Sequence, residues 1–273
     1  MNMKRRTLLA TVSAAALALV IGMPILGGSH AMADTLADIK ERGKIRIAVD
    51  LGSPPFGMTD AQMQPTGSDI ESARLVAEAL GVEVELVQVT GPNRVPALLT
   101  GQADIVMASF SVNEERKKVI DFTDAYGVIQ IVVAAGSGAG ASVTKPEDLN
   151  GVQVGTTRGS TNDLEATAKL PGAQLTRYDD DATLVTALVS GQVDVMASSP
   201  QIMAAVNQRR TADPLSVKLV LKTNPYAIGL RKGDDALKAR LNEVIAENLK
   251  NGKLSEIYNR YTGVPLPATL PKT

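Results

Sequence analysis

The sequence predicts an α/β protein built from two similar lobes. Three observations lead to this fold class: the length of 273 residues, an alternation of strand-like and helix-like segments, and an internal repeat of one helix–turn–strand pattern. The length is about twice that of a common single domain, which favours two units of roughly 120 residues each. Strands separated by helices are typical of parallel α/β construction.

The first elements show this alternation. Residues 44 to 49 form a β-rich run that ends in a Gly- and Pro-rich loop, which predicts a strand followed by a turn. A helix follows, with Ser68 and Glu71 at the spacing of a capping box and Gly81 as the expected C-terminal residue. Residues 82 to 86 then alternate apolar and charged side chains, as a half-buried strand does.

The internal repeat joins residues 98 to 109 with residues 188 to 198. Each segment has the pattern of a helix end, a glycine turn at Gly101 or Gly191, and a buried strand that ends in serine. Ligands of open α/β sheets bind at the C-terminal ends of strands, so two such units predict a cleft between facing lobes. The alternative is chance similarity, because glycine caps and β-branched strands recur in many proteins.

Residues 1 to 33 have the features of an export signal: a basic start, an apolar run over 8 to 26, and a small-residue cleavage site at 31 to 33. Asp34 is then the first residue of the mature, periplasmic protein. An uncleaved membrane anchor is the alternative, since the apolar run is nearly long enough to span a bilayer. Arg5 and Arg6 leave both the general secretory and the twin-arginine route open.

The composition excludes several classes of function. The chain is 44% apolar and 21% charged with a net charge of −1, which is typical of a soluble globular protein without nucleic-acid partners. It contains no Cys, and its one His, His30, lies in the export signal. This excludes Ser-His-Asp and Cys-His catalysis, Cys or His zinc sites, disulfides and lipid attachment at an N-terminal cysteine. We expect a monomer without cofactor or metal.

Seven short motifs then follow one another along the mature chain, at 50 to 56, 101 to 104, 111 to 116, 119 to 126, 149 to 151, 159 to 161 and 229 to 233. This ordered set resembles the family 3 periplasmic solute-binding proteins, the amino-acid receptors of ABC importers. The resemblance covers nearly the whole mature chain. It implies a small-molecule ligand, a membrane permease as partner, and lobes that close over the ligand.

The same resemblance implies how the chain divides. The fold is the two-lobed periplasmic binding protein fold of type II, in which two α/β lobes are joined by a double-crossover hinge. The crossings fall near 126 to 130 and 222 to 226. Lobe 1 then takes residues 34–128 and 227–273, and lobe 2 takes residues 129–226.

A carboxylate site is predicted around Arg116. Asn113 is a good helix N-cap, and Arg116 follows in the first turn, beside backbone N–H groups that favour anions. Its planar guanidinium matches a carboxylate, although an exposed ion pair with neighbouring glutamates is equally consistent with the local sequence. The resemblance implies that Arg116 holds the ligand's α-carboxylate, with Ser109, Ser111 and Thr161 as polar contacts. For Thr161, a plain helix cap is the alternative.

The expected ligand contacts depart from the family pattern at three places. The segment with Arg94 resembles receptors for acidic amino acids, which implies a second anion anchor. However, Asp50 and Asp181 stand where those receptors carry cations, which weakens an assignment to aspartate or glutamate. Ser199 stands where the family carries the Asp that pairs with the ligand's ammonium group. Either Asp50 or Asp181 replaces that Asp, or the ligand lacks an α-amine.

An enzyme is the competing class of function, because a few exported proteins of this fold are dehydratases or lyases. A cleft carboxylate with a raised pKa serves as a general acid in such chemistry. Asp50, Asp180 and Asp181 are the candidates by sequence position. No carboxylate pair is identifiable, and binding therefore remains the preferred function.

Overall fold

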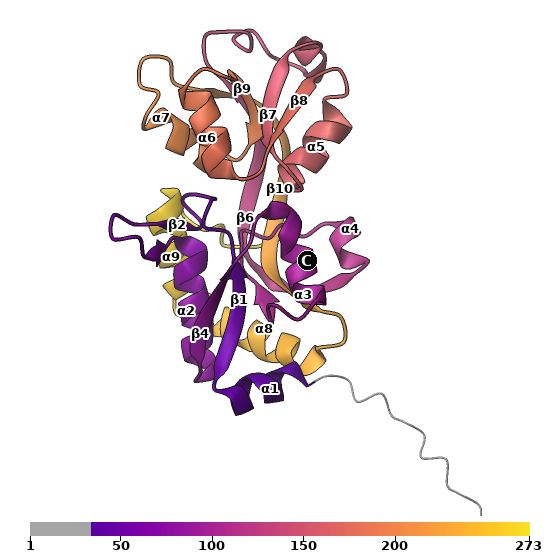
Figure 1. Ribbon diagram of the computed structural model, residues 1–273, viewed down its shortest axis with the longest axis vertical. Helices are drawn as coiled ribbons and strands as arrows, with labels where there is room; N and C mark the ends of the chain where they lie inside the picture. Colours follow the sequence, from indigo (N-terminus) through magenta and orange to yellow (C-terminus); the bar gives the residue numbers. More distant parts are fainter. Residues whose placement is uncertain (1–33) are drawn as a thin grey trace, which may run out of the picture. The chain divides into compact units, whose positions relative to one another are not determined.

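The computed structural model describes residues 34–273 (Figure 1). The export signal predicted for residues 1–33 lies outside the described residues. Within 34–273, strands and helices alternate as predicted. The helices are α1 Thr35–Arg42, α2 Ser68–Leu80, α3 Arg94–Leu99, α4 Glu114–Lys117, α5 Thr161–Lys169, α6 Asp181–Val189, α7 Pro200–Asn207, α8 Asp235–Lys250 and α9 Lys253–Thr262, with short 3-10 turns at Gly91–Asn93 and Pro146–Leu149.

The strands of the described chain include two that are much longer than the others, β6 and β10. The strands are β1 Lys44–Val49, β2 Met58–Thr59, β3 Pro65–Thr66, β4 Glu83–Gln88, β5 Ile105–Val106, β6 Ile120–Ala135, β7 Gln153–Thr157, β8 Gln174–Tyr178, β9 Val195–Ser198 and β10 Ser216–Arg231.

One sheet, in the order β4-β1-β5-β10-β6-β9-β7-β8, connects both halves of the described chain. The short strands pair in parallel, β1 with β4 and β5, and β7 with β8 and β9, which confirms the predicted parallel construction there. The long strands β6 and β10 are antiparallel to each other and lie side by side in Figure 1. Residues 126 to 130 and 222 to 226 lie within this pair.

Four apolar clusters form the cores of the two lobes, two clusters in each. In lobe 1, alternate residues of β1 point to opposite faces of the sheet, because the side-chain period of a strand is two. Ile45, Ile47 and Val49 pack with α2, α8 and α9, whereas Ala48 packs with α3. In lobe 2, Met196 of β9 packs with α6 and α7, and its neighbours pack with α5. The lobe boundaries at 128/129 and 226/227 stay a prediction.

The internal repeat is confirmed as two helix–turn–strand units. Gly101 lies between α3 and β5 with φ of 71°, and Gly191 lies between α6 and β9 with φ of 74°. Both turns need this left-handed conformation, which glycine adopts without steric cost. The repeated sequence therefore delivers the residues after β5 and after β9 to equivalent strand ends.

The predicted capping box of α2 is wrong. The N-cap is Gly67, whose φ is 124°, and Ser68 is already the first helical residue, with no hydrogen-bond partner for its hydroxyl. Glu71 instead accepts hydrogen bonds from Arg260 and Tyr261 of α9. The helix begins one residue earlier than the Ser/Glu spacing predicts, because Gly67 approaches the preceding loop closely. The predicted end at Gly81 is confirmed, with φ of 72°.

Candidate functional site

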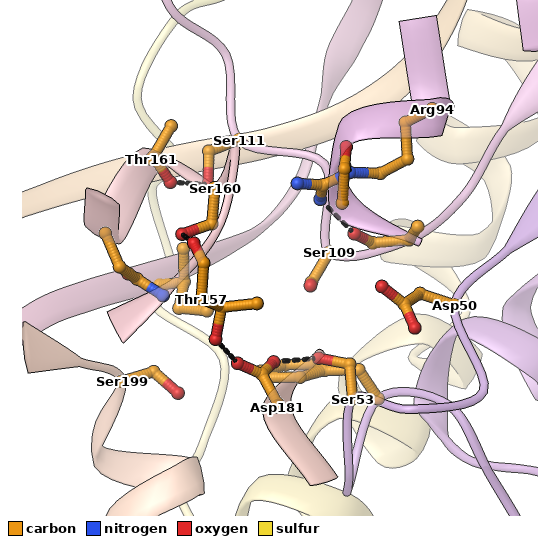
Figure 2. Close-up of a pocket in the computed structure, with 15 residues that line it drawn as sticks. Asp50, Ser53, Arg94, Ser109, Ser111, Thr157, Ser160, Thr161, Asp181 and Ser199 are labelled. Carbon is orange, nitrogen blue, oxygen red and sulfur yellow. Dashed lines mark hydrogen bonds between the residues drawn. The ribbon is translucent and has the colours of Figure 1, made fainter. Parts of the chain in front are cut away.

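A cavity lies where strand ends and helix starts of both lobes meet. Lobe 1 contributes the segments after β1 and β5 and the start of α3, and lobe 2 contributes the segments after β7, β8 and β9 (Figure 2). The lining residues are Asp50, Ser53, Phe56, Gly91, Arg94, Ala108, Ser109, Ser111, Ile129, Thr157, Ser160, Thr161, Asn162, Asp181 and Ser199. The cavity volume is about 30 Å³, which is room for roughly two water molecules.

Seven of the eight predicted site residues line this cavity, and the eighth lies beside it. Asp50, Arg94, Ser109, Ser111, Thr161, Asp181 and Ser199 are lining residues. Arg116 is not, but its guanidinium donates to the backbone carbonyl of the lining residue Ser111 at 2.7 Å. The sequence therefore placed all eight residues in one neighbourhood, although they are spread over 150 positions of the chain.

Arg116 bridges the two lobes from the start of α4. Asn113 caps this helix as predicted, accepting from the N–H of Arg116 at 2.8 Å. The guanidinium donates to carbonyl oxygens of Ser111 and, at 3.4 Å, of Gly159 in lobe 2, and it lies 4.3 Å above the ring of Phe110. The ion pair with neighbouring glutamates is excluded: Glu114 and Glu115 pair with lysines instead.

Arg94 is a second buried arginine, with 6% of its surface exposed. Its Nε donates to the carbonyl of Gly91 and its Nη1 to the carbonyl of Ala108, both at 3.1 Å. In residues 34–273, no carboxylate forms an ion pair with either Arg94 or Arg116. Burial lowers the pKa of both groups, and for Arg116 the nearby Arg94 lowers the pKa further. An anion that enters the cavity offsets the free-energy cost of burying the charges of Arg94 and Arg116.

The lobe 2 side of the cavity is built from helix starts. Ser160 is the N-cap of α5, accepting from the N–H of Asp163 at 3.2 Å, and Thr161 is the first helical residue. The hydroxyl of Thr161 reaches across to donate to Oγ of Ser111 at 3.1 Å (Figure 2). Ser199 caps α7 by accepting from the N–H of Ile202 at 3.3 Å. The hydroxyl of Ser199 therefore already has a structural acceptor role.

Two carboxylates share the cavity with Arg94. Asp50 accepts from the N–H of Gly52 at 3.0 Å through Oδ1, and no donor in residues 34–273 reaches its other oxygen. Burial raises the pKa of Asp50 to about 6, and the charge of Asp181 acts in the same direction. Asp181 accepts from the hydroxyls of Ser53 and Thr157, one on each oxygen (Figure 2). Burial raises the pKa of Asp181 as well.

Sequence reasoning missed Asp69, which lies behind the cavity in α2. Its Oδ2 accepts from the N–H of Ser109 at 2.6 Å, and its Oδ1 accepts from the hydroxyl of Tyr126 at 3.3 Å. Ser109 has φ of 42°, a conformation that costs energy for a residue with a side chain. Full burial raises the pKa of Asp69 to about 7. No local pattern singles out an Asp in the first turn of a helix, where acidic residues are common.

Thr157 and Ser160 were also missed, although the sequence carried a signal for them. The run 152 to 157 contains the β-branched residues Val152, Val154, Thr156 and Thr157 and is followed by Gly159, which predicts a strand that ends before a turn. The rule that ligands bind at strand ends applies to this run as it does to the internal repeat.

Residues 34–273 include no group of three or more acidic residues that could hold a metal ion. No helix of this part of the chain is long and apolar enough to cross a membrane.

Comparisons with known proteins identify the family of the chain. The family model of bacterial extracellular solute-binding proteins, family 3, matches residues 45–264. The L-cystine-binding protein TcyJ of Escherichia coli strain K12 is 28% identical over 249 residues, which are 91% of this chain and 92% of TcyJ. The ABC transporter glutamine-binding protein GlnH of Bacillus subtilis strain 168 is 30% identical over 240 residues, covering 84% of each chain.

Solved structures of similar proteins share the fold. The ancestral amino acid-binding protein AncCDT-1, described as a precursor of cyclohexadienyl dehydratase, is 31% identical, with a TM-score of 0.77 over 84% of this chain and 99% of that one. AbpA of Streptococcus pneumoniae, an amino acid ABC transporter substrate-binding protein bound to L-arginine, is 27% identical, with a TM-score of 0.76 over 83% of this chain. These likenesses bear out the predicted two-lobed fold of type II.

Proposed function

The chain belongs to the bacterial extracellular solute-binding proteins of family 3. We propose that it captures a small polar amino acid or a related carboxylate between its lobes and delivers it to the permease of an ABC importer. The relatives named for binding cystine and glutamine support an amino-acid ligand. One observation carries the proposal: Arg116 is 8% exposed and has no ion-pair partner in residues 34–273, beside polar groups of both lobes.

The ligand's carboxylate binds between Arg116, Ser111 and Thr161. The first N–H groups of a helix have no intrahelical partner, so the start of α5 offers donors next to the hydroxyl of Thr161. The guanidinium of Arg116 supplies charge and a planar pair of donors, replacing its present long contact with the carbonyl of Gly159. Arg94 remains the proposed second anion anchor, for a polar group elsewhere on the ligand.

The ligand's ammonium group pairs with Asp50. Both oxygens of Asp181 already accept hydroxyl hydrogens, and Ser199 carries no charge and caps α7. Asp50 retains an open oxygen inside the cavity. The charged groups around the cavity, Arg94 and Arg116 against Asp50 and Asp181, sum to zero, which suits a zwitterion better than a doubly charged anion.

Calorimetry on four proteins tests this assignment: the parent, Asp50→Asn, Ser199→Asp and the double variant. If the ligand carries an α-amine, Asp50→Asn leaves a buried cation unpaired and weakens binding by about 2 kcal/mol or more. Ser199→Asp then restores part of that loss in the double variant. Asp60→Asn, the same change in an exposed turn, is the matched control.

The opposite pattern identifies a ligand without an amine. In that case Asp50→Asn is nearly neutral, and Ser199→Asp alone weakens binding because it sets an unpaired carboxylate near an anion. Parent-like affinity of Asp50→Asn for an α-amino acid contradicts the assignment of Asp50 as the ammonium partner.

Catalysis is the second candidate, and the raised pKa of Asp50, about 6, is the observation that favours it. A carboxyl group in that range can act as a general acid near neutral pH. Against it, Asp180 caps α6 by accepting from Thr183, and each oxygen of Asp181 already accepts from a hydroxyl, so neither carboxylate is placed as a catalytic partner of Asp50. We therefore propose that the protein is not an enzyme. Prephenate or arogenate, incubated with the protein and analysed by chromatography, should be recovered unchanged.

We also propose the periplasm as the place of action. Residues 1–33 carry the chain across the inner membrane and are removed before Asp34, and the absence of Cys leaves no site for N-terminal lipidation. The lobes divide at 128/129 and 226/227, within the long antiparallel pair β6 and β10. Mass spectrometry of the exported protein tests the cleavage site, with Asp34 as the expected first residue.

A further inference from the structure

Asp181 links the two lobes across the cavity. It is the first residue of α6 in lobe 2, and its Oδ2 accepts from the hydroxyl of Ser53, in the lobe 1 loop after β1. Its Oδ1 accepts from Thr157 of its own lobe. The carboxylate thus has one hydroxyl donor from each lobe, and neither oxygen is open in the way that Oδ2 of Asp50 is.

The backbone beside Asp181 makes a second link between the same segments. The N–H of Ala182 donates to the carbonyl of Gly52 at 2.8 Å. The approach is close: a Cβ built on Gly52 lies 2.9 Å from Cβ of Asp180 and 3.0 Å from its Cγ. Asp180 has little freedom to move away, because its Oδ1 caps α6 through the N–H of Thr183 at 2.7 Å. This approach of the lobes therefore requires glycine at position 52.

We propose that Gly52, Ser53, Asp181 and Ala182 form an inter-lobe latch that sets ligand affinity by stabilising the closed lobes, without contact between Asp181 and the ligand. This replaces the ligand contact that the sequence predicted for Asp181. The effect on affinity rests on the proposed function, but the latch itself does not, because all its bonds form between protein groups.

The latch acts on affinity through the population of the closed form. A ligand held by both lobes binds tightly only when they are closed, so its apparent dissociation constant is the intrinsic constant divided by the closed fraction. When the lobes part, water solvates Asp181 and Ser53, and the net gain from one such hydrogen bond is modest. Removing the Ser53 link should therefore lower the closed-to-open ratio by about threefold or more.

The test measures lobe distance in ligand-free protein. Because the chain contains no Cys, cysteines introduced at Gln62 in lobe 1 and Gln192 in lobe 2 are the sole labelling sites for single-molecule energy transfer; both positions are exposed. The variants are Ser53→Ala, Asp181→Ala, the double variant and Gly52→Ala. Thr100→Val is one control, because the hydroxyl of Thr100 is exposed and donates to the carbonyl of Pro96 within lobe 1. Gly138→Ala is the other, because a Cβ built on Gly138 has its nearest neighbour 3.4 Å away.

The latch predicts a smaller closed fraction for Ser53→Ala and Asp181→Ala, and a double variant no more open than Asp181→Ala. Gly52→Ala should be the most open, and Thr100→Val and Gly138→Ala should match the parent. Circular dichroism confirms that each variant is folded. An unchanged distance distribution in folded Ser53→Ala and Gly52→Ala, or an equal opening in Thr100→Val, overturns the proposal. None of these outcomes depends on the ligand, so failure of the latch and failure of the proposed function are separate results.

Discussion

Buried charge at single residues is the basis of the proposed site. Arg94 and Arg116 are nearly inaccessible, and carbonyl oxygens solvate them in place of carboxylates. A buried cation without an ion-pair partner carries a desolvation cost that an incoming carboxylate offsets. The two arginines therefore support the proposal that this cavity binds ligands with a carboxylate in preference to neutral ones.

Replacement of Arg116 tests this argument. Arg116→Ala should cost about 2 to 5 kcal/mol of binding free energy, or roughly 30- to 4000-fold in affinity, because it removes one partner of a desolvated pair. Arg116→Lys should also bind weakly, since an ammonium group cannot reproduce the two-pronged fork. Calorimetry measures both, with Arg209→Ala, an exposed arginine of lobe 2, as control. Parent-like affinity in both Arg116 variants would remove this residue from the site.

Asp69 gives the protein a predictable pH dependence. Its pKa rises from the ordinary 3.8 to about 7 because it is fully buried. At pH values between about 4 and 7 the carboxyl group of Asp69 stays protonated in the folded protein, whereas it is ionised in the unfolded chain. The free energy of unfolding should therefore fall, by on the order of 3 kcal/mol, as pH rises from about 4 to about 7. Asp50, with a pKa of about 6, acts in the same direction.

Chemical denaturation across this pH range measures the effect. Asp69→Asn keeps an acceptor for the N–H of Ser109 but no longer titrates, so its stability should depend less steeply on pH than that of the parent. Asp60→Asn, the same substitution in an exposed turn, is the matched control. An identical slope for the parent and Asp69→Asn would show that Asp69 is ionised in the folded protein throughout this range.

At the scale of elements, α2 and the loop after β1 form one unit. The N–H groups of Ser68 and Asp69 donate to the carbonyls of Pro55 and Phe56, and Phe56 lines the cavity. A Cβ on Gly67 would lie 2.3 Å from the Phe56 oxygen, and the φ of 124° disfavours any other residue. The start of α2 thus places Asp69 and the cavity loop together.

Substitution at Gly67 should therefore be costly. Gly67→Ala combines a clash with backbone and a forbidden φ, and we expect a loss of more than about 2 kcal/mol of stability in urea denaturation. Gly81→Ala, at the other end of α2, has a φ of 72° but open space, and it should lose only about 1 kcal/mol. Equal losses at the two positions would mean that the close approach to Phe56 does not matter.

The elements differ in how far the sequence predicted them. The strand at 44 to 49, the end of α2 at Gly81 and both halves of the internal repeat follow from local rules, and the structure confirms them. The start of α2 does not follow, because a tertiary contact of Gly67 overrides the capping pattern. The 16-residue strands β6 and β10 also escape local rules, since their length comes from pairing with each other.

The site shows the same division between local and tertiary information. Ordered motifs brought eight residues to one neighbourhood, but their bonding partners were not predictable. Asp181 is a predicted ligand contact, and no local pattern predicts that its carboxylate accepts from Ser53, 128 positions away. Ser199 stands where the family carries a charged Asp, and the structure shows that its hydroxyl caps α7. Partner choice between distant segments is set by the fold and not by local sequence.

For the whole molecule, the two lobes and their shared sheet explain how capture of a ligand is possible. Each lobe has its own apolar cores, so the lobes can move as units, and β6 and β10 connect them. The cavity of about 30 Å³ has room for roughly two water molecules, so we expect the lobes to part before they close over an amino acid. Both lobes contribute donors, which makes closure and binding one coupled event.

A thermal-shift screen against amino acids and small carboxylates tests whether the cavity between the lobes binds an amino acid through its carboxylate. A ligand present at about 100 times its dissociation constant adds about 2.7 kcal/mol of stability, which raises the melting temperature measurably. We expect at least one α-amino acid to do so in the parent protein, and its methyl ester, which lacks the carboxylate, to have no effect. A melting temperature unchanged by every amino acid and carboxylate at millimolar concentration, or raised equally by the ester, would show that the cavity does not bind an amino acid through its carboxylate.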